Sequence, residues 1–182
     1  TNKELAQKLR EGCRSVIHLA AVLGVHRTEL DRLRCLEINI EGTRRVLDLA
    51  AQHRVHKFIF ASSSEVYGEP LKLPVTEEAL TQGKSVYAVS KLAGELYMQD
   101  YAYTYGMRTG VFRMSCIYGT RQFGFEDQGW VAHFAISTIH GLPITIYGDG
   151  KQVRDLLYVD DLARLFEMLY KNAHVSSGKL YN

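Results

Sequence analysis

Cysteine and proline are scarce in this sequence of 182 residues, which contains three of each. The odd number of cysteines, and the lack of any Cys-x-x-Cys pair among Cys13, Cys35 and Cys116, argue against a secreted disulfide framework and a structural zinc site. No signal peptide and no apolar run of ~18 residues is present. The net charge of +2 is too small for a protein that binds phosphate backbones. These absences predict a soluble cytoplasmic protein with no nucleic-acid or membrane partner.

Two further patterns are missing. No histidine stands in a ligand spacing such as His-Glu-x-x-His, so no metal site is predicted. A Gly-x-Gly-x-x-Gly loop is also missing, although a dinucleotide-binding sheet should begin with one. The last residues, 179–182, have the pattern of a strand that is just beginning. We therefore expect either a fold without that loop or a natural protein that extends beyond both ends.

The chain does contain an alternation of short apolar runs and helix-period segments. Because the predicted strands are apolar throughout, the alternation predicts an α/β fold with a doubly wound parallel sheet. Ligands of such sheets bind at the carboxyl ends of the strands. The predicted strands are 16–19, 57–61, 109–114, 156–159 and 179–182, and the predicted helices are 36–54, 85–105, 130–140 and 162–170, the last with Asp160 or Asp161 as its cap.

Tyr87 and Lys91 lie four positions apart in the predicted helix 85–105 and therefore share one face. A nearby ammonium is expected to lower the pKa of a tyrosine from ~10, as a general base that removes a hydroxyl proton requires. The spacing also fits an ordinary exposed pair. It recurs at Tyr147 and Lys151, where the intervening glycines exclude a helix.

Three serines, Ser62-Ser63-Ser64, directly follow the predicted strand 57–61 and lead into Glu-Val-Tyr-Gly. A serine here is placed to hydrogen-bond the substrate oxygen that Tyr87 deprotonates. A polar turn also explains serine and glycine, but it does not require three serines followed by Val-Tyr-Gly. The strand, the serines and the Tyr-x-x-x-Lys helix together form a more specific constellation than either motif alone.

These residues resemble the extended short-chain dehydrogenase/reductases that act on nucleotide sugars, and the resemblance covers nearly the whole chain in order. It implies a Rossmann-like sheet, with 1–118 as a partial NAD-binding domain. It also implies that 119–182 form part of a substrate-binding region whose strand and helix return to that sheet. The motifs that carry the resemblance are His18-Leu-Ala-Ala21, Asn39-Ile-Glu-Gly-Thr43, the serine segment, Tyr87-x-x-x-Lys91, Arg113-x-x-x-x-Tyr118-Gly119, and the segments 148–155 and 159–162.

By this resemblance the catalytic triad is Ser63, Tyr87 and Lys91. The cofactor, NAD, would contact Leu19, Ala20, Ala21, Asn39, Tyr87 and Lys91. The nucleotide-sugar substrate would contact Ser64, Glu65, Cys116, Gln128 and Arg154. Arg154 would clamp the diphosphate, because a planar guanidinium binds phosphate oxygens in pairs. The resemblance also implies a homodimer formed by the helices near 36–54 and 85–105.

The segment 122–131, together with Gly-Lys-Gln-Val-Arg-Asp at 150–155, looks like the CDP-paratose 2-epimerases, also called CDP-tyvelose epimerases. A loop in which Asp127 caps a helix near Trp130 would also explain the first segment. Cys116 stands where many relatives have asparagine, and Thr120 replaces the usual proline. Ser64 stands where 4,6-dehydratases have an acid, which disfavours dehydration because the loss of water needs a proton donor.

The activity implied by the resemblance is NAD-dependent epimerisation of a nucleotide-diphosphate sugar through a keto intermediate, at C2 of a CDP-dideoxyhexose. A UDP-hexose 4-epimerase, or another dehydratase or decarboxylase of the same family, is the alternative. A hypothesis of another class is a non-catalytic nucleotide-binding module or an inactive fragment. The intact set of Ser63, Tyr87 and Lys91 argues against a loss of catalysis, whereas the missing glycine loop favours an incomplete piece of an enzyme.

Overall fold

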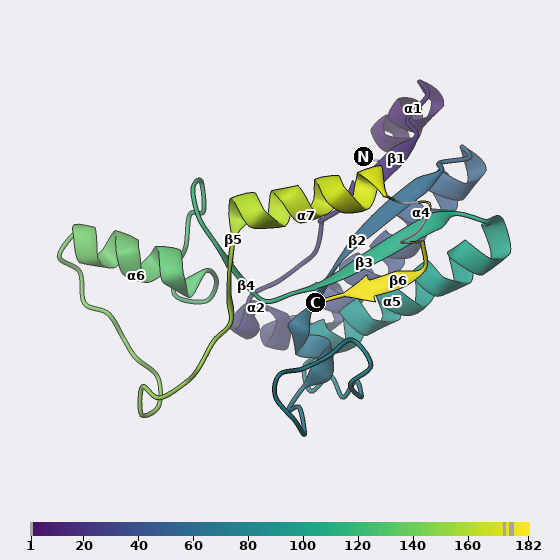
Figure 1. Ribbon diagram of the computed structural model, residues 1–182. Helices are drawn as coiled ribbons and strands as arrows, with labels where there is room; N and C mark the ends of the chain where they lie inside the picture. The colour runs from purple at the N-terminus through teal and green to yellow at the C-terminus, as the bar shows by residue number, and fades with distance from the viewer. Residues whose placement is uncertain (1, 173, 175–176) are drawn as a thin grey trace.

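Four parallel strands form the main sheet of the computed structural model, which describes residues 2–172, 174 and 177–182 (Figure 1). Helices lie between the successive strands, as parallel connections require. The predicted α/β fold with a parallel sheet is confirmed. The strands occur in the spatial order β1 (Ser15–His18), β2 (Lys57–Ser63), β3 (Arg108–Met114) and β6 (Lys179–Tyr181).

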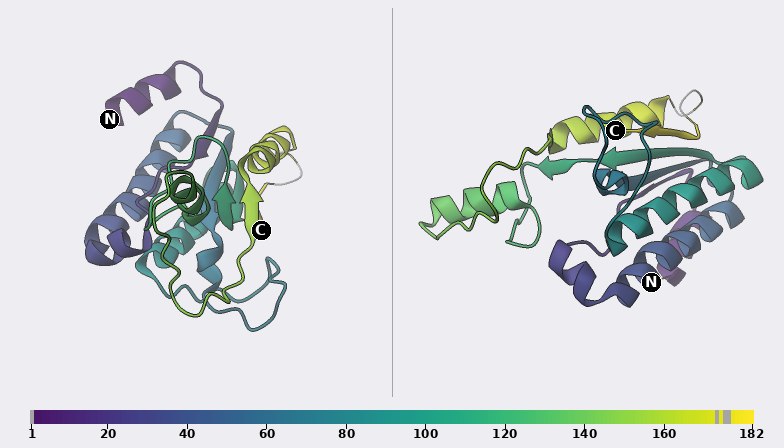
Figure 2. Two further views of the ribbon diagram at one scale, coloured as in Figure 1. Left: turned by 90° about the vertical axis from the view of Figure 1, so that its left-hand side faces the viewer. Right: turned by 90° about the horizontal axis from the view of Figure 1, so that it is seen from below.

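Two layers of helices cover the opposite faces of this sheet (Figure 2). Helices α4 and α5 pack on one face, and α7 packs on the other. The helices are α1 (Asn2–Arg10), α2 (Val25–Leu30), α3 (Arg32–Leu36), α4 (Gly42–Gln52), α5 (Val86–Tyr105), α6 (Trp130–Ile139) and α7 (Val159–Lys171), with a π-helical turn η1 (Glu37–Glu41) and a 3-10 turn η2 (Ser64–Tyr67).

Strand β2 contributes to both cores because successive side chains of a strand point to opposite faces. Phe58 and Phe60 are fully buried in the cluster that includes Leu47 of α4 and other side chains of α5. Ile59, between them, is buried with Leu169 of α7 on the other face. A strand with apolar residues at every position is therefore explained by two covered faces.

Helix α5 approaches β2 closely at Gly94. A Cβ atom at this position would lie 2.4 Å from Cζ of Phe60, so any larger residue would collide with the buried ring. The glycine thus lets the helix lie directly on the strand that leads to the serine segment.

The predicted helix 36–54 begins and ends earlier than expected. The helical run starts with α3 at Arg32, continues through η1, and ends with α4 at Gln52. Its start is fixed by Asp31, whose side chain accepts a hydrogen bond from the backbone N–H of Arg34 at 3.2 Å. The residues around this cap are mostly charged, so the helical spacing of apolar residues on which the prediction depended is not visible there.

The predicted cap of the last helix is also wrong. Helix α7 begins at Val159, and its cap residue is Tyr158, whose backbone is extended. Asp160 and Asp161 lie within the first turn, where carboxylates interact favourably with the positive end of the helix dipole.

A small second sheet joins β4 (Cys116–Tyr118) to β5 (Leu156–Tyr158) in parallel. Helix α6 stands apart from the main sheet (Figure 1). Past residue 118, α7 and β6 return to the main sheet, where β6 pairs with β3. Every helix within the described part of the chain is too short or too polar to cross a membrane.

Candidate functional site

The candidate site forms where β2 ends and α5 begins. Strand β2 ends in Ser63, and the chain turns through η2. Helix α5 then starts at a serine cap, because Ser85 Oγ accepts from the backbone N–H of Ala88 at 3.0 Å. The same hydroxyl donates to Glu65 at 3.0 Å, which ties the start of the helix to the serine segment.

The structure brings Ser63, Tyr87 and Lys91 together. The phenol of Tyr87 is hydrogen-bonded with Ser63. The Nζ atom of Lys91 lies 5.6 Å from the centre of the Tyr87 ring and donates to the carbonyl oxygen of Ala61 at 2.7 Å. The Tyr-x-x-x-Lys pair is therefore part of an interior arrangement and is not an ordinary exposed pair.

Lys91 is an almost fully buried amine, with 4% of its surface exposed. Burial lowers the pKa of Lys91 from 10.5 to about 8, because removing the ammonium from water disfavours its charged form. The ammonium nevertheless stays the main form at neutral pH. The site thus holds a positive charge beside the Tyr87 ring.

The expectation that Lys91 lowers the pKa of Tyr87 is wrong for the protein without a ligand. Burial, and next the charge of Glu65, raise the pKa of Tyr87 to about 12. The hydrogen bond with Ser63 acts in the opposite direction, and Cys35 adds to the rise. Burial dominates because the phenolate loses its hydration. Tyr87 needs a further positive charge before it can act as a base near neutral pH.

Replacing Lys91 with Met is expected to raise stability at pH 7 by about 2 kcal/mol. The lowered pKa corresponds to a cost of about 3 kcal/mol for burying the ammonium, and the lost hydrogen bond to Ala61 offsets about 1 kcal/mol. Between pH 8 and 10.5 the unfolded chain binds more protons than the folded one, so the wild type gains stability as the pH rises. The advantage of the variant should vanish near pH 10 in urea unfolding.

The exposed Lys151 provides the control for this experiment, since Lys151→Met should show no such pH-dependent difference. An advantage of Lys91→Met that stays constant from pH 7 to 10 would contradict the assignment of a lowered pKa to Lys91.

The expected cofactor residues Leu19, Ala20 and Ala21 directly follow β1, at the carboxyl end of the sheet. Leu19 is 56% exposed although it directly follows β1, so its side chain offers an apolar surface at the carboxyl end of the sheet. A planar ring of a dinucleotide can pack on such a surface. The ammonium of Lys91 can donate hydrogen bonds to polar groups of the dinucleotide. These residues are therefore compatible with NAD.

Asn39, the fourth expected cofactor residue, is buried in the π-helical turn η1. Its amide accepts from the backbone N–H of Val22 at 2.7 Å and donates to the carbonyl oxygen of Val22 at 3.0 Å. It also donates to Ser90 at 3.0 Å, and Ser90 donates to the carbonyl of Tyr87. Asn39 therefore joins the loop after β1 to the helix that carries Tyr87, a role that the sequence did not reveal.

The expected substrate residues lie in three places. Ser64 and Glu65 are exposed in η2, beside the triad. Cys116 begins β4, and its backbone N–H donates to the carbonyl of Asp155, so the exposed Arg154 lies next to the start of β4. Gln128 lies in a separate turn, where it exchanges backbone hydrogen bonds with Phe125.

Asp127 does not cap the helix near Trp130, for which Gly129 is the cap residue. It accepts instead from the backbone N–H of His26 at 2.7 Å, near the start of α2. Gly24, the cap residue of α2, has a φ of 104° and approaches the carboxylate so closely that an added Cβ would lie 2.4 Å from it. The carboxylate thus supplies a cap to a helix that lies about 100 positions earlier.

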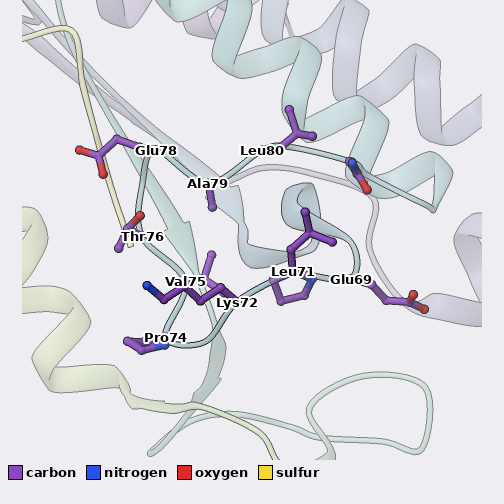
Figure 3. A pocket seen from close by; sticks show the side chains of 11 residues that line it. Glu69, Leu71, Lys72, Pro74, Val75, Thr76, Glu78, Ala79 and Leu80 are labelled. Atoms are coloured by element: carbon purple, nitrogen blue, oxygen red, sulfur yellow. The ribbon is translucent and has the colours of Figure 1, made fainter.

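The loop between η2 and α5 borders an open hollow of about 330 Å³ (Figure 3). Its wall includes Leu71, Val75 and Leu80, and it contains neither Tyr87 nor Lys91. The hollow is therefore adjacent to the candidate site along the chain and is not formed by the triad.

The second Tyr-x-x-x-Lys match, at Tyr147 and Lys151, lies in an irregular exposed segment, as the intervening glycines predicted. No group of three or more His, Cys, Asp or Glu side chains within the described residues is placed to hold a metal ion. The groups that meet at the described site are the hydroxyl of Ser63, the phenol of Tyr87 and the ammonium of Lys91.

Comparison with known proteins places these observations in a family. The chain matches the NAD dependent epimerase/dehydratase family over residues 1–182, and it belongs to that family. It is 35% identical over 190 aligned positions to the CDP-paratose 2-epimerase of Salmonella typhi, an alignment that covers 92% of this chain and 56% of that protein. It is 34% identical over 152 positions to the UDP-glucose 4-epimerase of Mycolicibacterium smegmatis, which covers 83% of this chain and 49% of that protein.

Among solved structures, the UDP-glucose 4-epimerase of Thermus thermophilus in complex with NAD superposes with a TM-score of 0.87 at 33% identity. The match covers 93% of this chain and 57% of that one. The chain thus spans about half the length of the relatives that it matches.

Proposed function

We propose that the protein catalyses the NAD-dependent epimerisation of a nucleotide-diphosphate sugar through a transient keto intermediate. The observation that carries this proposal is the phenol of Tyr87, hydrogen-bonded with Ser63 and lying beside the buried ammonium of Lys91. Membership of the epimerase/dehydratase family supports it. A base, a hydroxyl donor and a fixed cation are the groups that oxidation of a sugar hydroxyl requires.

Tyr87 acts as the general base in this proposal. Its phenolate removes the proton from a sugar hydroxyl while Ser63 hydrogen-bonds the same oxygen, and the carbon loses a hydride to become a carbonyl. When the sugar has turned over, the hydride returns to the opposite face of that carbon, and Tyr87 returns the proton to the oxygen. The product is the epimer, with no net oxidation.

The cofactor would lie along Leu19, Ala20 and Ala21, with Lys91 at its ribose. NAD, when bound, supplies the hydride acceptor and donor and a positive charge that lowers the pKa of Tyr87. Asn39 contributes by holding the loop after β1 through Val22. In this proposal these side chains bind and orient the cofactor, and the phenol of Tyr87 transfers the proton.

The substrate would contact Ser64 and Glu65 near the reacting carbon, with Cys116, Gln128 and Arg154 around the nucleotide part. Arg154 is exposed next to the start of β4, where its Nη1 donates to the carbonyl of Val153 at 3.1 Å and its guanidinium has further N–H groups to offer to a diphosphate. The finer assignment, C2 of a CDP-dideoxyhexose, is supported by the segments 122–131 and 150–155 and by the relative from Salmonella typhi. The C4 epimerisation of a UDP-hexose is the second candidate, supported by the relative from Mycolicibacterium smegmatis.

Product analysis in D2O tests the proposal. The protein is incubated with NAD and either CDP-paratose or UDP-glucose, and the products are followed by proton NMR. We expect inversion at C2 of the CDP-sugar without deuterium at that carbon, because the hydride leaves and returns without exchanging with water. Inversion of UDP-glucose at C4 alone would favour the second candidate. Loss of water, or no turnover by a protein that binds NAD, would reject epimerisation.

We also propose that the protein acts as a homodimer through the outer face of α5. Val89, Leu96 and Tyr103 recur every seven residues on this helix and are 49%, 58% and 93% exposed. Positions seven apart share one face of a helix, so these side chains form an apolar stripe open to a partner. Two copies packed by this helix and the neighbouring α4 would cover it.

Replacing Leu96 with Glu is expected to shift the protein from dimer to monomer, because two buried carboxylates would face each other across the two-fold axis. Mass photometry over a dilution series measures the shift. Leu71→Glu, on the loop before α5, is the matched control, since Leu71 is equally apolar and more exposed but lies off the stripe. A wild type that is monomeric at all concentrations would reject the proposed dimer.

A further inference from the structure

Three residues of α5 at four-residue spacing each contact one of the last three residues of β2. This spacing places the three on one face of the helix, along the strand end that leads into the site. The pairs are Tyr87 with Ser63, Lys91 with Ala61, and Glu95 with Ser62. The first two pairs belong to the proposed catalytic site, and the third continues the same row one helical turn further.

Glu95 is an acid in the interior of the protein, with 1% of its surface exposed. Its Oε1 accepts from the hydroxyl of Ser62 at 2.5 Å and from Nε of Arg113 at 3.0 Å. Its Oε2 accepts from Nη2 of Arg113 at 2.7 Å. The carboxylate is therefore held from two strands at once, by β2 through Ser62 and by β3 through Arg113.

Arg113 extends this network away from the triad. The guanidinium is 5% exposed, and its Nη1 donates to the hydroxyl of Tyr67 at 2.8 Å and to the carbonyl of Glu77 at 3.2 Å. The Tyr67 hydroxyl donates in turn to Asn182, just past β6. Both partners of the buried pair are thus satisfied by neighbours as well as by each other.

We propose that Glu95 is a positioning residue that fixes the register of α5 against the end of β2 and thereby holds Ser63 against the phenol of Tyr87. Ser62 transmits this effect, because it is covalently adjacent to Ser63 and bound to Glu95. This inference rests on the proposed function of the triad. It extends the Tyr-x-x-x-Lys motif by one turn to Tyr-x-x-x-Lys-x-x-x-Glu.

Stability alone does not account for an ion pair at this place. Removing two charges from water costs so much that an apolar pair of similar size is often as stable or more so. A buried carboxylate adds specificity of geometry, because its oxygens are fully hydrogen-bonded only when Ser62 and Arg113 stand in one arrangement. A slip of α5 along β2 would break these bonds, whereas apolar side chains would tolerate it.

Replacing Ser62 with Ala tests the inference without breaking the ion pair. The variant removes the link between Glu95 and the serine segment, whereas Glu95→Gln would leave Arg113 uncompensated in the interior and is prone to misfold. Tyr67→Phe is the matched control, because it removes one buried hydroxyl from the far end of the same network. We expect both variants to lower the melting temperature by similar amounts.

The direct readout is the NMR signal of ¹³Cζ in Tyr87 at pH 7, assigned through Tyr87→Phe, since this carbon senses the hydrogen bond of its own hydroxyl. The groups that face this phenol are Ser63, Glu65, Cys35 and Lys91. We expect Ser62→Ala to move the signal in the same direction as Ser63→Ala and to have no effect in the Ser63→Ala background. Tyr67→Phe should leave the signal in place.

Turnover provides the second readout. Ser62→Ala should lower kcat by about 10- to 100-fold with little change in KM, because a small misplacement of catalytic groups affects the reaction more than binding. The acidic limb of its pH profile should move to higher pH, since the hydrogen bond with Ser63 lowers the pKa of Tyr87. Tyr67→Phe should retain the wild-type kcat and profile.

Two results would overturn the inference. One is an unchanged Tyr87 signal in Ser62→Ala while Ser63→Ala moves it. The other is an equal displacement in Ser62→Ala and Tyr67→Phe, which would make the network a general stabiliser. If the wild type shows no turnover but the signals move as expected, the proposed function fails and the positioning role of Glu95 stands.

Discussion

Tyr87→Phe should lower kcat by about 1,000-fold and leave the binding of NAD largely intact. The substitution removes one hydroxyl, so the ring keeps its packing in the half-buried site next to Lys91. The loss corresponds to a general base, whose contribution is typically 10²–10⁴-fold. Steady-state kinetics measure the first effect, and the rise in melting temperature with added NAD measures the second.

Tyr147→Phe is the appropriate control for that experiment. Tyr147 has a lysine four residues later, as Tyr87 does, but it lies exposed in an irregular segment. The variant should retain the wild-type kcat, because spacing without a helix brings no ammonium and no serine to the phenol. An active Tyr87→Phe variant would reject the proposed mechanism.

Arg113→Met should destabilise the protein by about 3–5 kcal/mol. The substitution keeps the bulk of the side chain but leaves the carboxylate of Glu95 in the interior without its cation. An uncompensated buried charge is among the most costly changes in a folded protein. Urea unfolding at pH 7 measures the free energy of unfolding, and a loss below about 1 kcal/mol would contradict the interior ion pair.

The double variant Glu95→Leu/Arg113→Met separates the cost of an unpaired charge from the worth of the pair. With both charges removed, the loss of stability should fall below about 2 kcal/mol, because neither variant side chain needs a partner. If Glu95 positions Ser63, the double variant should nevertheless have a lower kcat than the wild type. Stability restored together with full turnover would contradict that role.

Local patterns were sufficient for the elements that carry the triad. The predicted strand 57–61 and helix 85–105 correspond to β2 (Lys57–Ser63) and α5 (Val86–Tyr105). Both have signals within a few residues, an apolar run closed by serines in the first and a serine cap before an apolar stripe in the second. Helix α2 lacks such a signal, since its carboxylate cap comes from Asp127.

The electrostatics of the site could not be predicted from spacing. The sequence places Lys91 one turn from Tyr87, but the pKa of the phenol depends on burial and on Glu65, and both depend on the tertiary fold. The sequence does contain a signal for Glu95, but the spacing of residues alone does not show what this side chain does. It stands one turn after Lys91, and Arg113 lies in the buried part of β3, where a charge requires a buried partner.

The hydrogen bond between Asp127 and His26 would make the two proposed ligand regions energetically dependent on each other. It joins the segment around residues 122–131 to the helix that follows the loop after β1. A nucleotide that orders the first segment would thereby change the free energy of ordering the second, where the dinucleotide is proposed to lie. Linkage requires that such an effect be reciprocal, so each ligand would change the affinity for the other by the same factor.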